Sequence, residues 1–222
     1  MCIRDSKDPV VLIEFIEIIL LLLSKGITTF RLDAVAFIWK KHGTSCVNLP
    51  ETHEIVKLLR LIVNFINPYA LIVTETNLPR KENLSYFGND DEANWIYNFP
   101  LPPLILYTFL FEDSSKISGW SKSMPPAQIN NAYLNFIASH DGIGMRPAEG
   151  ILDNIILDKL FKRVKKNGGK FSFRKVESKN KVYEANITLF DALKRTDFDK
   201  DGIFAVERSV SYTHLRAHET TS

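Results

Sequence analysis

Three acidic side chains lie at or just after the ends of apolar, strand-like runs in this sequence. They are Asp33, Glu75 and Asp141, in the segments Phe30–Ala34, Val73–Asn77 and Ala138–Gly142. Retaining chemistry on a sugar needs one carboxylate as the nucleophile and a second as the proton shuttle, and a third carboxylate can hold the sugar ring. Acids delivered at successive strand ends therefore predict a site for retaining glycosyl transfer.

The first segment places a cation beside a candidate nucleophile. Arg31 and Asp33 are two residues apart on a predicted strand, so their side chains should point to the same face. A guanidinium next to a carboxylate keeps the carboxylate ionised, as a nucleophile requires. An ion pair that only closes the strand end is the alternative for this segment. Glu75 is the candidate general acid and base, because it ends the next strand and can share a site with Asp33.

The third segment adds a histidine to a carboxylate. Asp141 has two oxygens that could accept hydrogen bonds from sugar hydroxyls, and His140 could donate to one of them. A metal site is the competing interpretation. Outside residues 210–222 the chain has three histidines, and they show no pairing at metal-ligand spacing, so we expect no bound metal.

Helical and strand-like segments alternate along the chain. The pattern predicts helices over residues 9–24, 50–65 and 104–111, and strands over residues 27–32, 70–74, 95–99 and 133–139. From about residue 151 to 180 the pattern predicts loop with a short helix. The alternation favours a parallel α/β sheet or barrel, and four strands amount to half of an eight-stranded one. The predicted fold class is therefore α/β, a partial (β/α)8 barrel.

Composition limits the classes of protein that fit. The chain has 222 residues, 45% of them hydrophobic, and a net charge of +2, with basic residues concentrated between Lys159 and Lys181. A uniformly basic nucleic-acid binder is not indicated, so we expect no nucleic-acid partner. The most apolar run, Val10–Leu23, is short and contains two glutamates, which predicts a buried amphipathic helix and no membrane span. Two cysteines without a close pair fit a reducing compartment, and we expect a cytoplasmic protein.

The two ends of the chain differ in character from the rest. Residues 1–6 and 210–222 resemble translated adapter sequence, and we interpret them as non-native additions to a partial catalytic domain at residues 7–209. Half a barrel would leave two open sheet edges. We therefore expect the chain as written to be inactive by itself.

Several segments together resemble the α-amylase family of retaining glycosidases and transglycosylases, and within it the sucrose phosphorylase-like subfamily. The matching segments are Arg31–Val35, His42–Cys46, Leu101–Leu104 and Ser139–Gly144. Three more are similar to members that act on glucosylglycerate or sucrose phosphate: Leu49–Glu54, Thr74–Asn77 and Asn83–Gly88. The resemblance implies that the four strands are the fourth to the seventh of a barrel.

The resemblance also implies roles for single residues. Asp33 corresponds to the nucleophile, Glu75 to the acid and base, and Asp141 to the stabilising carboxylate. Arg31 and His140 would line the glucose subsite, and Tyr183 falls in a loop near the acceptor, where an aromatic packed under the loop is the alternative interpretation.

The implied reaction is phosphorolysis of sucrose, sucrose 6-phosphate or glucosylglycerate to α-glucose 1-phosphate, through a covalent glucosyl-enzyme. It needs inorganic phosphate as a co-substrate and no cofactor, so the expected partners are a small α-glucoside and phosphate. Two alternatives stay open: a hydrolase or transglucosylase of the same family, and an inactive remnant that binds carbohydrate. A requirement for phosphate would separate the first alternative from a phosphorylase.

Overall fold

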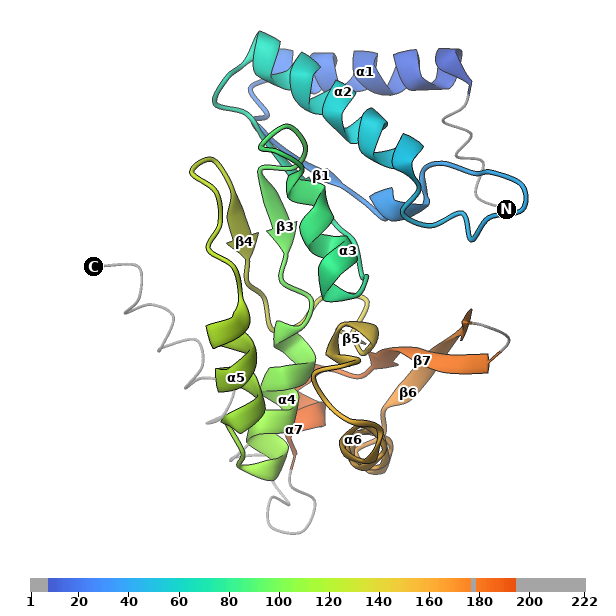
Figure 1. Ribbon diagram of the computed structural model, residues 1–222, viewed down its shortest axis with the longest axis vertical. Coiled ribbons are helices and arrows are strands. Elements are labelled where there is room, and N and C mark those ends of the chain that lie inside the picture. The colour runs from blue at the N-terminus through green and yellow to red at the C-terminus, as the bar shows by residue number, and fades with distance from the viewer. Residues whose placement is uncertain (1–7, 177–178, 195–222) are drawn as a thin grey trace. The chain divides into compact units, whose positions relative to one another are not determined.

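The computed structural model describes residues 8–176 and 179–194 (Figure 1). The expectations for residues 1–6 and 210–222 therefore lie outside the described residues. The chain forms two compact units, which we describe separately. The sheet unit contains the residues up to Asn98 together with 126–135, and the hairpin unit contains residues 99–125 and those from Phe136 onward.

The sheet unit is built on four parallel strands that are hydrogen-bonded in chain order. They are β1 (Thr29–Leu32), β2 (Leu71–Thr74), β3 (Trp95–Tyr97) and β4 (Ala132–Leu134). Phe30 pairs with Ile72, and Ile96 with Tyr133, so β-branched and aromatic residues occupy the interior of the sheet. This arrangement confirms the predicted parallel α/β sheet. All four carboxyl ends lie at the same edge, where β1 and β2 deliver Asp33 and Glu75.

Two long helices belong to the sheet unit, one before β1 and one between β1 and β2. Helix α1 (Pro9–Ser24) follows Asp8, whose side chain accepts a hydrogen bond from the Val10 N–H, and Pro9 occupies the first turn. Helix α2 (Pro50–Ile66) joins β1 to β2 and lies beside α1 (Figure 1). Both helices agree with the sequence prediction. The short elements η1 (Val35–Phe37), α3 (Arg80–Leu84) and η2 (Ser85–Phe87) complete the connections.

Helix α1 was predicted to be buried, and this prediction is wrong in part. On α1 only Ile19 is buried, and much of its apolar surface is exposed. On α2, Ile55 and Leu59 are buried, whereas Leu58 and Ile66 are exposed. A face pattern assigns one apolar stripe, whereas these helices carry apolar residues on several sides and pack only one of them within the sheet unit.

The hairpin unit combines helices with an antiparallel sheet. Its helical elements are α4 (Leu101–Phe111), α5 (Ser115–Ser123), η3 (Arg146–Ala148), α6 (Asn154–Lys166) and α7 (Leu189–Leu193). Its sheet has the order β5 (Ile143–Gly144), β7 (Lys179–Asn186), β6 (Lys170–Val176). Helix α4 is almost entirely buried and, with apolar residues of α6 and α7, forms the core of this unit.

Two sequence predictions in this region are wrong. Residues 151–180 were predicted as loop with a short helix; the helix is the 13-residue α6, but the described residues after it lie mostly in strands β6 and β7 and not in loop. Asp153 caps α6, and Leu157, Leu160 and Val164 place one apolar stripe against the core. The strand predicted over residues 133–139 ends at Leu134, and the chain then leaves the parallel sheet.

Candidate active site

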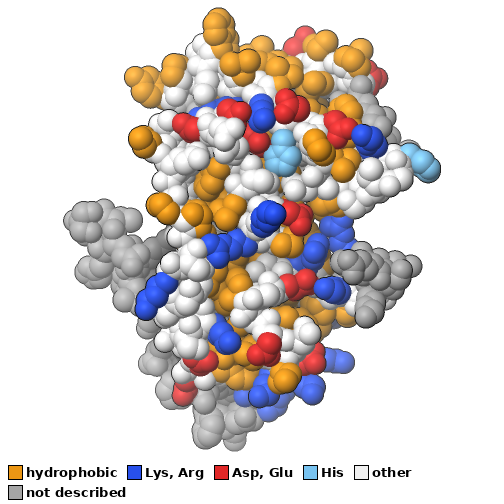
Figure 2. All heavy atoms as spheres, in the orientation of Figure 1, with side chains coloured by type: hydrophobic (Ala, Val, Ile, Leu, Met, Phe, Trp, Pro, Cys, Tyr) orange, Lys and Arg blue, Asp and Glu red, His pale blue; other side chains and the backbone are white. Residues whose placement is uncertain are grey.

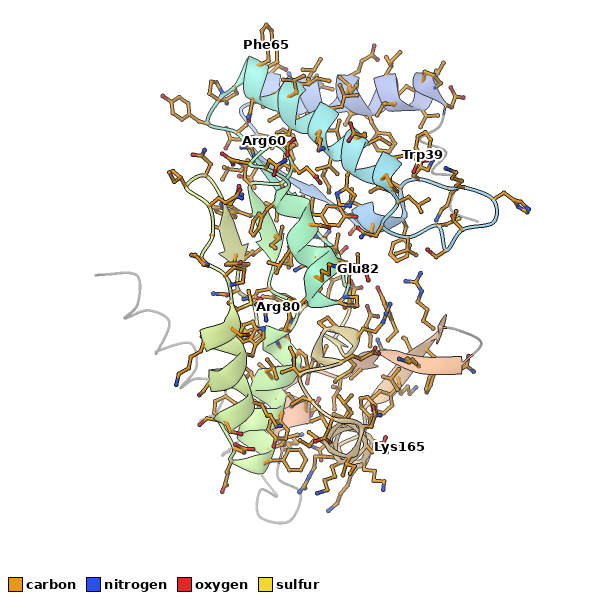
Figure 3. The ribbon with its side chains drawn as sticks, viewed as in Figure 1. Trp39, Arg60, Phe65, Arg80, Glu82 and Lys165 are labelled. Atoms are coloured by element: carbon orange, nitrogen blue, oxygen red, sulfur yellow. The ribbon has the colours of Figure 1, made fainter. Side chains whose placement is uncertain are left out.

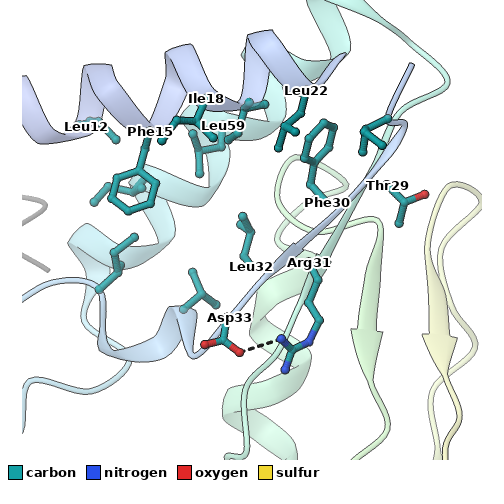
Figure 4. Close-up of a pocket in the computed structure, with 15 residues that line it drawn as sticks. Leu12, Phe15, Ile18, Leu22, Thr29, Phe30, Arg31, Leu32, Asp33 and Leu59 are labelled. Atoms are coloured by element: carbon teal, nitrogen blue, oxygen red, sulfur yellow. Dashed lines mark hydrogen bonds and ion pairs between the residues drawn. The ribbon is translucent and has the colours of Figure 1, made fainter. Parts of the chain in front are cut away.

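The end of β1 presents a paired cation and carboxylate. Arg31 Nη1 donates to Asp33 Oδ1 at 2.7 Å, and both side chains are partly open to solvent (Figure 4). The predicted common face of these two residues is therefore confirmed. After Asp33 the chain turns through Ala34, which adopts a left-handed conformation with φ of 47°. This turn directs the backbone N–H of Ala34 away from the strand ladder.

Glu75, at the end of β2, joins this pair. Its backbone N–H donates to the Leu32 carbonyl at 3.1 Å, which extends the ladder between β1 and β2. Its carboxylate accepts the N–H of Ala34 at 2.8 Å and lies 3.9 Å from Arg31 Nη2. Two neighbouring strand ends thus bring two carboxylates to one guanidinium, and the residue after Asp33 holds the carboxylate of Glu75.

The charge of Arg31 is reinforced by its surroundings. Burial acts to lower the pKa of its guanidinium, but Glu75, Tyr97 and Asp33 outweigh burial and raise the pKa above its ordinary value. Arg31 therefore stays a cation at every pH at which these carboxylates ionise. A fixed positive charge beside two carboxylates can orient both of them.

Tyr97 is a site residue that the sequence analysis missed. It ends β3, and the guanidinium carbon of Arg31 lies 5.8 Å from the centre of its ring. The rule that selected Glu75, a polar side chain at the carboxyl end of a parallel strand, would have found it. Three successive strands thus contribute one residue each to the surroundings of Arg31: Asp33 just after β1, Glu75 just after β2 and Tyr97 at the end of β3.

A buried polar network supports the segment after Glu75. The hydroxyl of Thr76 donates to Asn83 Oδ1 at 2.5 Å, and Asn83 Nδ2 donates to the Tyr97 carbonyl at 2.9 Å. Both Thr76 and Asn83 are buried. Polar groups buried in this way are satisfied by each other and restrict the loop that follows β2.

The third predicted carboxylate lies in the hairpin unit. Residues 139–142 form a tight turn, in which His140 Nε2 lies 3.4 Å from Asp141 Oδ2. Both side chains are exposed. Asn186 Nδ2 donates to the Asp141 carbonyl at 3.2 Å and ties the turn to the end of β7. The structure therefore brings Arg31, Asp33 and Glu75 together in one unit, and His140 and Asp141 together in the other.

Tyr183 was expected in a loop, but it belongs to the sheet of the hairpin unit. It lies on β7, and its carbonyl accepts the N–H of Met145 at 2.9 Å. Its ring is half-buried, 5.9 Å from the guanidinium carbon of Arg174. Because β5 pairs with β7 through Ile143 and Ala185, the strand with Tyr183 is joined directly to the strand that follows the Asp141 turn.

An apolar cleft of about 390 Å³ lies between α1 and β1 (Figure 4). Its walls are mostly aliphatic and aromatic, and Arg31 and Asp33 lie at one end.

Within the described residues, no group of three or more His, Cys, Asp or Glu side chains could hold a metal ion. Every helix of the described ranges is too short or too polar to span a bilayer.

Comparison with known proteins finds similar sequences but no matching family model. The chain is 44% identical over 202 residues to a glucosylglycerate phosphorylase of Spirochaeta thermophila, covering 89% of this chain and 34% of the relative. It is 39% identical over 195 residues to a glucosylglycerate phosphorylase of Escherichia coli, covering 87% of this chain and 35% of the relative. The chain thus spans about a third of the length of the curated relatives it matches.

A solved structure shares the fold. The crystal structure of a sucrose 6F-phosphate phosphorylase from Thermoanaerobacter thermosaccharolyticum superimposes with a TM-score of 0.74 at 23% sequence identity. The match covers 92% of this chain and 39% of that chain. The parallel sheet with its connecting helices is therefore part of a (β/α)8 barrel.

Proposed function

We propose that the parent protein of this chain is a retaining glucoside phosphorylase. The chain belongs to the sucrose phosphorylase-like branch of the α-amylase family, and it spans about a third of the length of the relatives it matches. The observation that carries the proposal is the position of Arg31. This guanidinium contacts the carboxylates of both Asp33 and Glu75, which end neighbouring strands. Two carboxylates held to one cation suit a mechanism in which one attacks and the other moves a proton.

The first half of the proposed reaction forms a covalent intermediate. A carboxylate oxygen of Asp33 attacks the anomeric carbon of an α-glucoside, and the bond from that carbon to the leaving oxygen breaks. Glu75 gives its proton to the leaving oxygen. The product is a β-linked glucosyl ester of Asp33. We assign to Asp141 and His140 the binding of glucose hydroxyls, and to Tyr183 a role toward the acceptor.

The second half transfers the glucosyl group from Asp33 to phosphate. A phosphate oxygen attacks the anomeric carbon, the ester bond to Asp33 breaks, and ionised Glu75 accepts the proton from phosphate. Two inversions at one carbon give α-glucose 1-phosphate with retained configuration. Phosphate is a co-substrate in this scheme, and no metal or organic cofactor takes part.

The donor that we propose is glucosylglycerate. The support comes from the relatives, since those named glucosylglycerate phosphorylase are 39% and 44% identical, against 23% for the sucrose 6F-phosphate phosphorylase. Sucrose and sucrose 6-phosphate are the donors to compare with it.

The test completes the barrel and measures its products. Residues 8–194 replace the matching third of the Spirochaeta thermophila enzyme, and the chimera is given each donor with and without phosphate. We expect glucosylglycerate to yield α-glucose 1-phosphate only when phosphate is present, and Asp33→Asn to abolish this product. Equal release of free glucose without phosphate would identify a hydrolase and overturn the proposal. An unchanged rate in Asp33→Asn would remove Asp33 from the mechanism.

A further inference from the structure

A closed series of contacts connects the ends of β1, β2 and β3. Asp33 binds Arg31, whose guanidinium approaches the ring of Tyr97. The backbone of Tyr97 continues the series, because its carbonyl accepts a hydrogen bond from Asn83. From Asn83 the series passes through Thr76 to its neighbour Glu75. The Glu75 carboxylate accepts the N–H of Ala34, the residue after Asp33, and this closes the series.

Asn83 links the segment after β2 to the end of β3 in this series. It lies on α3, is almost fully buried, and uses both ends of its amide. Its oxygen accepts the hydroxyl of Thr76, the residue after Glu75, and its nitrogen donates to the Tyr97 carbonyl. One side chain thus fixes the end of β2 relative to the end of β3.

We propose that Asn83 is a positioning residue for glucosyl transfer, which acts through Thr76 to hold the carboxylate of Glu75 against Ala34 and Arg31. The proposal rests on the proposed function, since it assigns a role relative to the acid and base of that reaction. The role of Asn83 is indirect, since its side chain binds Thr76 and the Tyr97 carbonyl. Its effect reaches the site through the backbone that joins Thr76 to Glu75 and through the strand end at Tyr97.

The physical basis is that catalytic rates are sensitive to small displacements of the reacting groups. A shift of about 1 Å in a catalytic group can lower a rate by about 100-fold. Removing one partner of a buried hydrogen bond leaves the other unsatisfied, and the local structure relaxes to reach water or another partner. For Thr76 and Asn83, such relaxation moves the residue adjacent to Glu75.

The kinetic test uses matched variants of the completed chimera. Thr76→Val removes the hydroxyl with little change of shape, and Thr76→Ser restores it. We expect Thr76→Val and Asn83→Ala to lower kcat at least about tenfold, to displace the pH profile of kcat, and to change KM less. Thr76→Ser should recover most of the rate. Asn167→Ala is the control, because the Asn167 side chain holds three carbonyls in the hairpin unit.

A second readout on the 222-residue chain does not depend on activity. Deuterium exchange of the Ala34 amide reports its hydrogen bond to Glu75. The Ile72 amide of β2, which donates to Asn94 Oδ1, is the internal reference. We expect Thr76→Val and Asn83→Ala to speed exchange at Ala34 more than at Ile72. Equal changes at both amides, or kinetic variants that match Asn167→Ala, would overturn the positioning role. An inactive chimera or an active Asp33→Asn variant would instead contradict the proposed function, and amide exchange would still decide this inference.

Discussion

At the scale of single residues, carboxylates of this protein lie in two kinds of setting. Asp33 and Glu75 share the cation of Arg31 at the strand ends. Asp113, between α4 and α5, is instead held by hydrogen bonds from Ser115 and from the Tyr107 hydroxyl at 2.7 Å. Asp33 and Glu75 thus face a cation, whereas each oxygen of Asp113 accepts a hydrogen bond.

Asp113 gives a prediction about pH. Hydrogen bonds from Ser115 and Tyr107 lower the pKa of this carboxyl to about 2, from 3.8. A lowered pKa in the folded state means that ionised Asp113 stabilises the fold above about pH 4, and that this stabilisation is lost as pH falls toward 2. Asp113→Asn should therefore unfold at lower urea concentration than wild type at pH 7, and the difference should shrink at pH 2.

The control for this prediction is Tyr107→Phe. It removes one donor and should cost less stability at pH 7 than Asp113→Asn. If the urea midpoints of wild type and Asp113→Asn differ by the same amount at pH 7 and pH 2, ionised Asp113 is not the source of the stabilisation. The same bond to Asp113 raises the pKa of Tyr107 to about 12, so this bond should persist in mildly alkaline buffer.

At the scale of elements, the Asp141 turn depends on close packing against β7. Gly142 has a φ of +94°, and a Cβ at this position would overlap the carbonyl oxygen of Ala185. Asn186 and the pairing of Ile143 with Ala185 fix the same contact. The position of Asp141 is therefore set by backbone proximity between the turn and β7.

Gly142→Ala should lower the stability of the chain by about 1–3 kcal/mol, because it adds backbone strain and steric overlap. Gly150→Ala is the matched control, since Gly150 also has a positive φ but no atom lies within 4 Å of an added Cβ. Urea unfolding of the two variants separates the two effects. Equal losses would show that conformational strain alone is responsible and that the contact with Ala185 is not limiting.

The elements differ in how well the sequence predicts them. Helix α1 matches its predicted bounds because Asp8, Pro9 and Gly26 are local signals for its start and end. Helix α6 was predicted only as a short helix because its many lysines obscure a narrow apolar stripe, and β6 and β7 were missed because they are stabilised by pairing with each other. The fourth strand was drawn too long, since the apolar residues after Leu134 pack in the other unit.

Some contacts of the candidate site could also be predicted from the sequence, and others could not. The pairing of Arg31 with Asp33 follows from the two-residue period of a strand and could be predicted. The approach of Glu75 to Ala34 could not, because it depends on the left-handed turn that Ala34 adopts after β1. Asn83 was equally hidden, since only the folded chain places it beside Thr76 and Tyr97.

At the scale of the whole molecule, apolar side chains gather on the outer surfaces of α1 and α2. Figure 2 shows hydrophobic side chains along the rim formed by these helices, and Phe65 projects outward in Figure 3. Phe65 is 86% exposed and Tyr69 is 87% exposed, and Leu61 and Val10 are also exposed. Apolar patches of this kind favour association with other apolar surfaces.

We expect the 222-residue chain to associate as its concentration rises, and Leu61→Lys combined with Phe65→Glu to weaken that association. Sedimentation velocity over a range of concentrations measures the effect. Ile155→Lys is the control, since Ile155 is 70% exposed on α6. Equal effects of the two changes would mean that association does not involve α1 and α2, and a monomer at every concentration would contradict the prediction.

The order of the parallel sheet has a consequence for synthesis. Strands β1 to β4 are hydrogen-bonded in the order in which they occur along the chain. Each strand that leaves the ribosome therefore finds its partner already made, and the sheet can grow in the direction of translation. Arg31, Asp33 and Glu75 can meet once β2 has emerged, before Tyr97 and the whole hairpin unit exist.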